Sequence, residues 1–344
     1  MDTDRLIEIA NAIVAEGKGI LAADESSPTI KRRFDSIAVE STAENRRDYR
    51  EMLFRTEGAA DFISGVILFD ETIRQAGADG TSLVEVLVDR DIIPGIKVDK
   101  GAKPLAGAEG ETVTEGLDGL RERLAEYAAL GARFTKWRAV IAIGDGMPSR
   151  YCTDANAHAL ARFAALSQEA GLVPIVEPEV LMDGDHDIDT CYEATEAALR
   201  AVYHQLGHHR VALAGTLLKP NMVLSGKSAD NRAGPQRVAE ATVACLLETV
   251  PAAVPGILFL SGGQSDEEAT VNLDSINRHA SLVGAPWELS FSYGRGLQAA
   301  PLKAWGGNAA NYAAAQRAFH HRAMVTSAAR RGAYQPALEA ASVS

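Results

Sequence analysis

Apolar residues recur along the chain in short runs of strand length, separated by longer segments of helical period. The runs that predict β-strands are 19–23, 65–69, 92–98, 134–138, 173–177, 213–219, 256–260 and 289–293. Most segments between them are rich in Ala, Leu, Glu and Arg, with apolar residues at helical spacing; examples are 117–130, 155–170, 189–206 and 235–250. Because parallel strands need a crossover connection, this alternation predicts βαβ units and a parallel sheet.

The number and spacing of these units predict the overall fold. Eight strand-and-helix units at intervals of roughly 30 to 45 residues favour a closed (β/α)8 TIM barrel of the α/β class over an open, doubly wound sheet. We expect one such domain over residues 1–344. Within it, residues 1–17 carry an N-terminal helix that ends at Gly17, and the Ala-rich segment 332–344 forms a short mobile tail.

Composition and charge narrow the class of protein. The 344 residues are 47% hydrophobic and 23% charged, which is an ordinary composition for a chain with a large core, and the net charge of −12 offers no basic field for nucleic acid. Three widely spaced cysteines suit a reducing compartment better than a disulfide framework. No apolar run approaches the ~18 residues of a membrane span, and residues 1–5 lack the features of a signal peptide. We therefore expect a cytoplasmic protein with no nucleic-acid or membrane partner.

Polar and charged residues stand where the predicted strands end. In a barrel of this kind the functional side chains gather at the C-terminal ends of the strands. Seven of the eight runs end this way: Asp24 and Glu25 follow the first, Lys97 ends the third, Lys136 and Arg138 the fourth, Glu177 and Glu179 the fifth, Lys219 the sixth, Ser261 the seventh and Ser292 to Arg295 the eighth. One such residue is an ordinary strand cap, but the whole set indicates an active site. Side chains two apart share a strand face, so the pairs on the fourth and fifth runs each point together if the fifth strand continues past Pro178.

Two glycine-rich turns and a cationic cluster indicate an anionic ligand. The turns 260–265 and 292–297 follow the last two strands, where barrels often hold a phosphate on backbone N–H groups, and Arg295 lies in the second turn. Lys31, Arg32 and Arg33 follow the first strand. Taken alone this cluster is a solvated helix face, but beside the rim of a barrel it would bind a second phosphate. The sequence thus suggests a small, doubly phosphorylated ligand held at both ends.

Lined up in this order, the strand ends resemble those of the class I fructose-1,6-bisphosphate aldolases. The matching stretches are GKGILAADES at 17–26, GIKVDKG at 95–101, KWR at 136–138, VPIVEPE at 173–179, GTLLKPNM at 215–222, FLSGGQS at 259–265 and FSYGR at 291–295. The resemblance implies an aldehyde-lyase that reversibly cleaves fructose 1,6-bisphosphate to dihydroxyacetone phosphate and glyceraldehyde 3-phosphate in glycolysis and gluconeogenesis. It implies a lysine Schiff base, no metal or other cofactor, and a homotetramer.

The resemblance assigns the imine to Lys219, although by its residues alone the sequence makes Lys136 an equal candidate. Cleavage of the C3–C4 bond leaves a carbanion, for which a protonated imine is a far better electron sink than a ketone. Lys219 must then be a free amine near neutral pH, which burial and nearby cations such as Lys136 would favour.

The remaining catalytic roles also come from the resemblance. Glu177 would be the general acid for carbinolamine dehydration, with Glu179 close enough that two carboxylates raise the pKa of one of them and keep a proton available. Asp24 would orient the substrate and take or relay the C4 hydroxyl proton, and Lys136 would stabilise charge beside the imine.

The resemblance divides the substrate-binding residues between two ends of the ligand. Those that would hold the C1 phosphate are Ser261, Gly262, Ser292, Gly294 and Arg295. Those expected near the other phosphate or the substrate hydroxyls are Thr29, Arg32, Arg33 and Lys97, and Arg138 is also expected to contact substrate.

The chain departs from the family pattern at three places. Arg32 replaces a common lysine, Ala214 replaces a common glutamate, and the chain ends at Ser344 without the terminal tyrosine of eukaryotic members; Tyr334 is the only tyrosine of the tail. We therefore predict that C3 protonation of the enamine depends on Glu177, its neighbour Glu179, water or the substrate phosphate.

Three other functions remain open from the sequence. The eight histidines show no ligand spacing for a metal-dependent aldolase. A second imine-forming barrel, such as a deoxyribose-phosphate aldolase or transaldolase, would act on a substrate with one phosphate, and a non-catalytic scaffold role would not need the strand-end charges. Preference among fructose 1,6-bisphosphate, fructose 1-phosphate and sedoheptulose 1,7-bisphosphate is also open.

Overall fold

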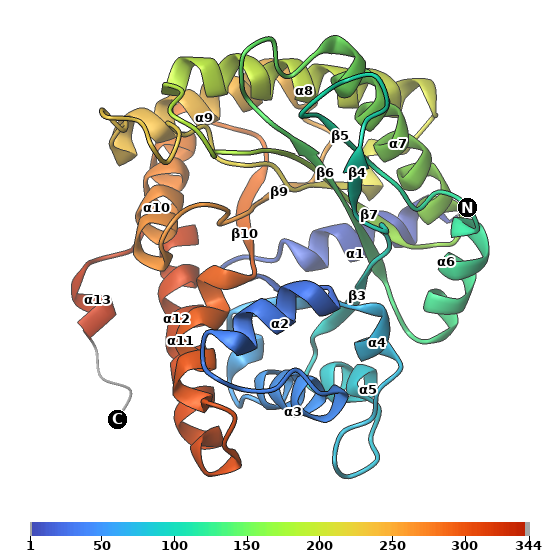
Figure 1. Cartoon of the computed structure of the whole chain (residues 1–344), viewed down its shortest axis with the longest axis vertical. Helices are drawn as coiled ribbons and strands as arrows, with labels where there is room; N and C mark the ends of the chain where they lie inside the picture. Colours follow the sequence, from blue (N-terminus) through green and yellow to red (C-terminus); the bar gives the residue numbers. More distant parts are fainter. Residues whose placement is uncertain (1, 341–344) are drawn as a thin grey trace.

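A computed structural model describes residues 2–340 of the chain, and eight parallel strands there close into a barrel (Figure 1). Around the barrel they run in the order β1-β10-β9-β8-β7-β6-β3-β2. Their bounds are β1 Gly19–Ala23, β2 Ile63–Leu68, β3 Ile93–Lys97, β6 Phe134–Ile141, β7 Val173–Val180, β8 Leu217–Leu218, β9 Gly256–Phe259 and β10 Glu288–Tyr293. The predicted (β/α)8 barrel is confirmed, and the open sheet is excluded because β1 pairs with both β2 and β10.

Helices surround this barrel on its outside (Figure 1). They are α2 Ser27–Asp35, α3 Ala43–Phe54, α4 Asp70–Ile73, α5 Leu83–Val88, α6 Leu120–Ala129, α7 Arg150–Glu169, α8 Ile188–His208, α9 Pro235–Thr249, α10 Asp266–Val283, α11 Arg295–Trp305, α12 Tyr312–Arg330 and α13 Ala337–Ala340. Short 3-10 turns lie at η1 Ala59–Asp61, η2 Leu213–Gly215 and η3 Ala309–Asn311. Within residues 2–340, no helix combines the length and the apolar character that crossing a bilayer requires.

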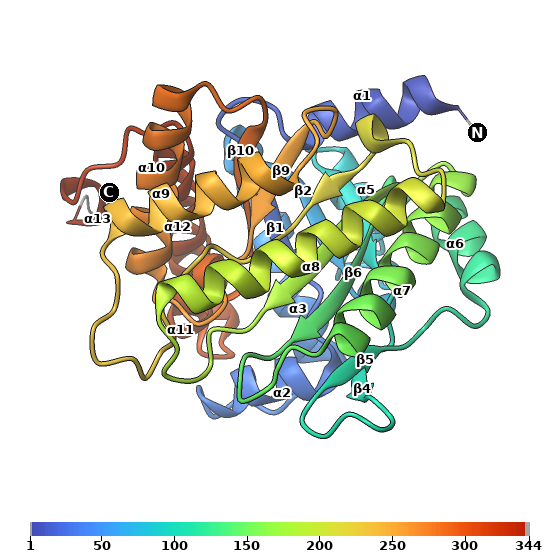
Figure 2. The same cartoon turned by 90° about the horizontal axis from the view of Figure 1, so that it is seen from above.

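The N-terminal helix α1, Thr3–Ile13, closes one end of the barrel (Figure 2). Its side chains Leu6, Ala10 and Ile13 are fully buried and pack against inward-facing residues of the strands. These strand residues are Ile20, Ala22, Ile67, Phe134, Val173, Ile175, Leu217 and Leu258. In Figure 2, α1 lies at the end of the molecule opposite α2, so the other end of the barrel is left for function.

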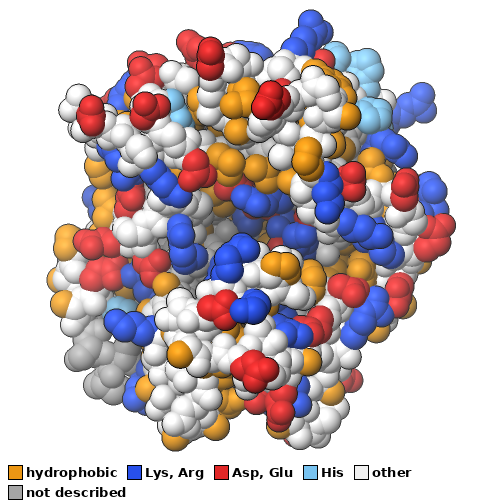
Figure 3. Space-filling view, in the orientation of Figure 1, with side chains coloured by type: hydrophobic (Ala, Val, Ile, Leu, Met, Phe, Trp, Pro, Cys, Tyr) orange, Lys and Arg blue, Asp and Glu red, His pale blue; other side chains and the backbone are white. Residues whose placement is uncertain are grey.

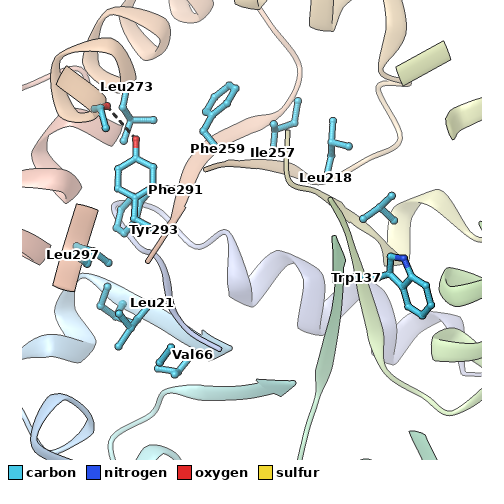
Figure 4. Packing of buried hydrophobic residues seen from close by; sticks show 14 of the residues in the cluster. Leu21, Val66, Trp137, Leu218, Ile257, Phe259, Leu273, Phe291, Tyr293 and Leu297 are labelled. Carbon is cyan, nitrogen blue, oxygen red and sulfur yellow. Dashed lines mark hydrogen bonds between the residues drawn. The ribbon is translucent and has the colours of Figure 1, made fainter. Parts of the chain in front are cut away.

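The alternate strand residues face outward and form the larger core beneath the helices (Figure 4). Leu21, Val66 and Phe259 belong to this layer, together with Leu273 of α10 and Leu297 of α11. This two-residue alternation is the period of a β-strand, with one face toward the barrel axis and one toward the helices. It explains why the strands read as continuous apolar runs in the sequence.

The sixth predicted strand is much shorter than its apolar run, so the prediction of a strand over 213–219 was wrong. Residues Leu213–Gly215 form the turn η2, and only Leu217–Leu218 are strand. The side-chain amide Nε2 of Gln168 in α7 donates hydrogen bonds to the backbone carbonyls of Ala212 and Gly215 at 2.9 and 3.1 Å, so these carbonyls do not pair in the sheet. Lys219 still follows the strand directly, and its backbone N–H donates to the carbonyl of Val176 at 2.8 Å.

Strands β6 and β7 extend beyond the predicted ends. They pair over eight residues, through Ala139 opposite Pro178 to Ile141 opposite Val180, so the fifth predicted strand does continue past the proline. The extension is supported by a hairpin that the sequence pattern did not predict, β4 Ala102–Pro104 and β5 Thr112–Thr114. Hydroxyls of Thr112 and Thr114 in β5 donate to carbonyls of β6 at 3.0 and 2.7 Å. The charged pairs on β6 and β7 thus lie within strands rather than in loops.

The N-terminal helix ends at Ile13, four residues before the predicted end at Gly17. Arg330 of α12 donates to the carbonyls of Val14 and Ala15, which follow the last helical residue, and Gly17 turns the chain with φ +72°. In the predicted tail, the backbone N–H of Tyr334 donates to Asp274 of α10 at 2.8 Å. Residues 341–344 of that tail lie outside the described residues, and its mobility stays a prediction.

Candidate active site

A cavity of about 1220 Å³ opens at the end of the barrel opposite α1. Every residue predicted for the site lines it: Asp24, Thr29, Arg32, Arg33, Lys97, Lys136, Arg138, Glu177, Glu179, Lys219, Ser261, Gly262, Ser292, Gly294 and Arg295. Figure 3 shows lysine and arginine side chains gathered around the hollow in the middle of this face. The protein as a whole is acidic, so the cationic character is a local property of the cavity.

Four charged side chains form a row at the centre of the cavity. The Nζ atom of Lys219 lies 3.1 Å from Oε1 of Glu177, whose Oε2 lies 3.1 Å from Nζ of Lys136. Lys136 Nζ also lies 2.6 Å from Oδ2 of Asp24. The two lysines and Glu177 are 3–4% exposed, so these ion pairs are almost completely removed from water.

The surrounding carboxylates hold Lys136 in its charged form. Burial lowers the pKa of Lys136, but Asp24, Glu177 and Asp99 outweigh it and raise that pKa well above its ordinary value. Burial raises the pKa of Asp24, and here the cations Lys136 and Lys219 prevail and bring that pKa far below the usual range. Lys136 is therefore an ammonium and Asp24 a carboxylate across the neutral pH range.

The expectation that a carboxylate pair keeps one proton is wrong for this site. Burial does act to raise the pKa of Glu177, but Lys136, Lys219 and Arg138 together lower it below its ordinary value. Its expected partner Glu179 instead forms an ion pair with Nε of Arg138. The three cations therefore outweigh burial, and Glu177 is ionised.

The turn 292–297, which is one of the two predicted to bind a phosphate, contains the start of α11. Gly294 is the residue before this helix, and the N-terminus of an α-helix attracts anions through its free backbone N–H groups. The Ser292 hydroxyl is 1% exposed, and no hydrogen-bond partner for it is found among the described residues. Gly262 is tightly surrounded, since a Cβ at this position would lie 2.9 Å from Oε1 of Glu179. The two glycine-rich turns thus bring the N-terminus of α11, the Ser292 hydroxyl without a partner and a tightly surrounded glycine to one side of the cavity.

The predicted second phosphate group comes from α2, and its members point in different directions. Lys31 turns to solvent, where its Nζ pairs with Asp35 at 2.8 Å. Arg32 donates to the Thr29 hydroxyl at 3.3 Å on the rim. Arg33 pairs with Glu25, and its Nη2 lies 3.4 Å from the place of a Cβ on Gly294. Arg33 therefore lies beside the turn after β10 rather than at the far end of the cavity with Lys97.

Sequence reasoning missed Asp99 and Gln298, which shape the site, and gave no role to the strand-end residue Glu25. Asp99 accepts from Nζ of Lys97 at 2.5 Å and from the backbone N–H of Arg138 at 3.2 Å. The two-residue spacing between Lys97 and Asp99 was a usable signal, because side chains two apart share a strand face. Glu25 and Gln298 meet at 2.7 Å between Oε1 and Nε2, a contact over 273 positions that no local pattern could predict.

Residues 2–340 contain neither a cluster of metal-ligating side chains nor an exposed cysteine. No group of three or more His, Cys, Asp or Glu side chains is arranged there to hold a metal ion. The three cysteines are free and buried. The polar groups that the cavity offers are therefore amines, guanidinium groups, carboxylates and hydroxyls.

Comparison with known proteins agrees with this geometry. The family described as "Fructose-bisphosphate aldolase class-I" matches residues 5–344. A Xanthomonas campestris protein named "Probable fructose-bisphosphate aldolase class 1" is 58% identical over 324 residues, 94% of this chain and 96% of that one. "Fructose-bisphosphate aldolase 4, cytosolic" of Arabidopsis thaliana is 54% identical, over 97% of this chain and 84% of the other.

A solved structure extends the similarity to three dimensions. Fructose-bisphosphate aldolase from Plasmodium falciparum, in complex with TRAP and a small-molecule inhibitor, has a TM-score of 0.94 and 48% identity over 96% of this chain and 95% of that one. The chain therefore belongs to the class-I fructose-bisphosphate aldolase family and is a lyase.

Proposed function

We infer that the chain reversibly cleaves fructose 1,6-bisphosphate to dihydroxyacetone phosphate and glyceraldehyde 3-phosphate through a Schiff base on Lys219. The observation that carries this inference is the buried row Lys219–Glu177–Lys136–Asp24, in which the two lysines have different numbers of carboxylate neighbours. Lys136 contacts two carboxylates and has a raised pKa, so it is unsuited to nucleophilic attack. Lys219 contacts one carboxylate, which favours it as the nucleophile.

Proton transfer from Lys219 to Glu177 would prepare both groups for imine formation. The two groups are 3.1 Å apart, so one transfer produces a free amine and a carboxylic acid together. The amine then attacks the C2 carbonyl of the substrate, and Glu177 returns the proton to the departing hydroxyl as water is lost. This sequence explains how an ionised Glu177 serves as a general acid without a pKa that is raised beforehand.

Carbon–carbon cleavage would use the other half of the row. Asp24 takes or relays the C4 hydroxyl proton, the C3–C4 bond breaks, and its electron pair moves into the iminium to give an enamine. Asp24 is held by Lys136 at 2.6 Å, and this ammonium also stabilises the charge beside the imine. Glyceraldehyde 3-phosphate leaves, and protonation at C3 followed by hydrolysis releases dihydroxyacetone phosphate.

Cations near both ends of the cavity support a bisphosphate substrate. We assign the C1 phosphate to the β9 and β10 ends, with Ser261, Gly262, Ser292, Gly294 and Arg295. Thr29, Arg32, Lys97 and Arg138 would bind the other phosphate or the substrate hydroxyls, and Arg33 lies beside Gly294 of the first group. If Arg32→Ala weakens use of the bisphosphate but not of fructose 1-phosphate, the assignment stands; equal effects would indicate a monophosphate enzyme.

Enamine protonation at C3 would not depend on Tyr334. The Tyr334 hydroxyl lies 3.4 Å from Oε1 of Glu339 and its side chain is 6% exposed, which favours a packing role. The proton at C3 would come from Glu177, Glu179, water or the substrate phosphate. The measurement is exchange of the C3 proton of dihydroxyacetone phosphate with solvent; complete loss of exchange in a chain cut before Tyr334 would contradict this view.

The setting of the reaction follows from the same family. We place the enzyme in glycolysis and gluconeogenesis, in the cytoplasm, as a homotetramer of single-domain (β/α)8 barrels. Support for the compartment comes from the Arabidopsis relative, whose name includes the word cytosolic.

Two treatments test the Schiff base against metal-dependent chemistry. Borohydride added together with fructose bisphosphate should inactivate the enzyme irreversibly, because it reduces the imine, whereas EDTA should leave turnover unchanged. Inhibition by EDTA together with resistance to borohydride would overturn the proposal.

A further inference from the structure

A second row of charged side chains lies beneath α2, outside the residues to which roles have been assigned. Arg46 and Arg50 extend from α3, and Glu71 from α4 lies against both. Arg46 makes two hydrogen bonds to Glu71, at 2.8 and 2.5 Å, and Nη1 of Arg50 lies 3.5 Å from Oε2 of Glu71. Beyond Arg50 the row reaches Glu25, the residue that follows Asp24, and so connects a distant helix with the cavity.

The Glu25 carboxylate lies beside two arginines, but only Arg33 is at hydrogen-bond distance from it, whereas Arg50 is farther away. Its Oε1 accepts from Nε2 of Gln298 at 2.7 Å and from Nη1 of Arg33. Its Oε2 faces Nη2 of Arg50 at 3.9 Å and has no hydrogen-bond partner among the described residues. A buried carboxylate oxygen without a partner is costly, so this geometry indicates a contact that forms in another state of the protein.

Arg50 has unused donors at the same place. Its side chain is 1% exposed, and Nη2 donates to the backbone carbonyl of Glu25 at 2.9 Å, which fixes the guanidinium beside the carboxylate. Its Nη1 and Nε have no hydrogen-bond partner among residues 2–340. A fully buried guanidinium is retained only where its charge is compensated, and here the compensating carboxylates are Glu25 and Glu71.

Arg33 is the more exposed of the two arginines beside Glu25. Its side chain is 23% exposed, lines the cavity, and lies beside Gly294 at the start of α11. A phosphate bound there would compete with Glu25 for the Arg33 guanidinium, since both are anions. If Arg33 left, Glu25 would stay buried with no cation in contact closer than 3.9 Å.

We propose that Arg50 is a positioning residue that becomes the ion-pair partner of the Glu25 carboxylate when Arg33 moves from Glu25 to a substrate phosphate. The inference rests on the proposed function, because it needs an anionic substrate in this cavity. Glu25 then closes the 3.9 Å gap to Arg50 and keeps a cationic partner in both states. Arg33 is released to the phosphate without leaving a buried charge unpaired, and substrate affinity depends on a side chain that never contacts substrate.

The first test compares two variants on one helix. Arg50→Met should raise the KM for fructose bisphosphate and the inhibition constant of inorganic phosphate by about tenfold or more, with kcat within about threefold of wild type. Arg46→Met is the matched control, because it removes a cation one turn away and leaves the Arg50–Glu25 contact in place; both constants should change by less than about threefold. Equal constants for the two variants would overturn the proposal.

Two further variants separate positioning from folding. Arg50→Lys keeps the charge and should restore part of the lost affinity. Adding Glu25→Gln to Arg50→Met removes the anion that needs a partner, so the double variant should recover most of the affinity of Glu25→Gln alone. A merely structural role for Arg50 predicts additive losses instead, and that result would contradict the proposal.

The unmodified protein provides a test that does not depend on any variant folding. A crystal structure with inorganic phosphate bound should show Arg33 on the phosphate and a hydrogen bond between Glu25 Oε2 and Arg50. Phosphate bound with Arg33 still on Glu25 would disprove the exchange. Trapping of an imine in the wild type, by borohydride with dihydroxyacetone phosphate, tests the proposed function separately. If no imine is trapped, the proposed function fails, while the phosphate-bound structure still decides whether Glu25 changes its partner from Arg33 to Arg50.

Discussion

Both ends of the barrel contain fully or almost fully buried side chains, but these are of opposite kinds. At the α1 end, Leu6, Ala10 and Ile13 pack on apolar strand residues and are fully buried. At the other end, Lys136, Glu177 and Lys219 are also almost fully buried, yet carry charges that compensate one another. Burial at one end stabilises the fold, whereas at the other end charged neighbours outweigh burial and set the charge state of the buried groups.

A single strand contributes an apolar side chain to the α1 end and a charged side chain to the cavity end, and the two residues are only two positions apart. In β6, Phe134 faces the α1 layer and Lys136 faces the cavity. In β7, Ile175 is followed two positions later by Glu177, and Leu217 of β8 is followed by Lys219 in the same way. Residues two apart share a strand face, so the inward faces form an apolar layer with a charged layer directly above it.

The largest expected effect is at the charged end. Lys219→Met removes the proposed nucleophile, so turnover should fall by about 10⁴-fold or more, while the melting temperature stays near that of wild type. Steady-state kinetics and thermal unfolding are the measurements. The matched control Lys31→Met, on an exposed lysine paired with Asp35, should retain full activity. Residual turnover near the wild-type level would reject Lys219 as the nucleophile.

The apolar end should show the reverse pattern. Leu6→Ala leaves a cavity under α1 and should lower the free energy of unfolding by about 3 kcal/mol, with kcat little changed in the folded enzyme. Urea unfolding and steady-state kinetics check both parts. Leu282→Ala, at a leucine that is 84% exposed, is the control and should have no measurable effect on stability. A large loss of kcat in the folded Leu6→Ala enzyme would show that the two ends are not separable.

A smaller effect depends on pH at the charged end. The folded pKa of Asp24 lies below its unfolded value of about 4, so ionised Asp24 stabilises the fold above that pH and the stabilisation fades as the pH falls. Asp24→Asn should therefore cost about 2 kcal/mol at pH 7 and less at pH 4. Urea unfolding at both pH values tests this. Asp35→Asn, at an exposed carboxylate, should show a small difference at either pH.

The smallest effect lies in the helical layer that both ends share. Burial raises the pKa of Cys152 to about 11 and that of Cys245 to about 12, and it also raises the pKa of Cys191. At pH 8 a thiol reagent should react very slowly with the native protein. Once urea unfolds the protein, the same reagent should modify all three cysteines readily. Rapid modification of the native chain would show that this layer opens far more readily than the barrel ends.

Strand positions and strand-end residues could be predicted from the sequence because both have local causes. The apolar runs reflect burial on both faces of parallel strands, and the functional residues follow them directly. The length of β8 was overestimated because Gln168, 45 positions before Leu213, donates hydrogen bonds to the backbone carbonyls that would pair in a longer strand. The β4–β5 hairpin was missed because its strands are three residues long.

The charge balance of the site could not be predicted, since it depends on contacts between distant segments. The sequence placed Glu177 beside Glu179 and suggested that they share a proton, whereas the fold surrounds Glu177 with cations. Likewise Arg50 lies in an ordinary charged helix segment, and nothing near it in the sequence indicates that it reaches Glu25. Side-chain partners from separate strands and helices decide these properties.

The site of the covalent adduct is the most direct test of the account. The enzyme is treated with borohydride and dihydroxyacetone phosphate, digested and analysed by mass spectrometry. The geometry predicts a single reduced adduct on Lys219, because Lys136 is held as an ammonium by Asp24 and Glu177. An adduct on Lys136, or no adduct in an enzyme that turns over, would contradict the proposed mechanism.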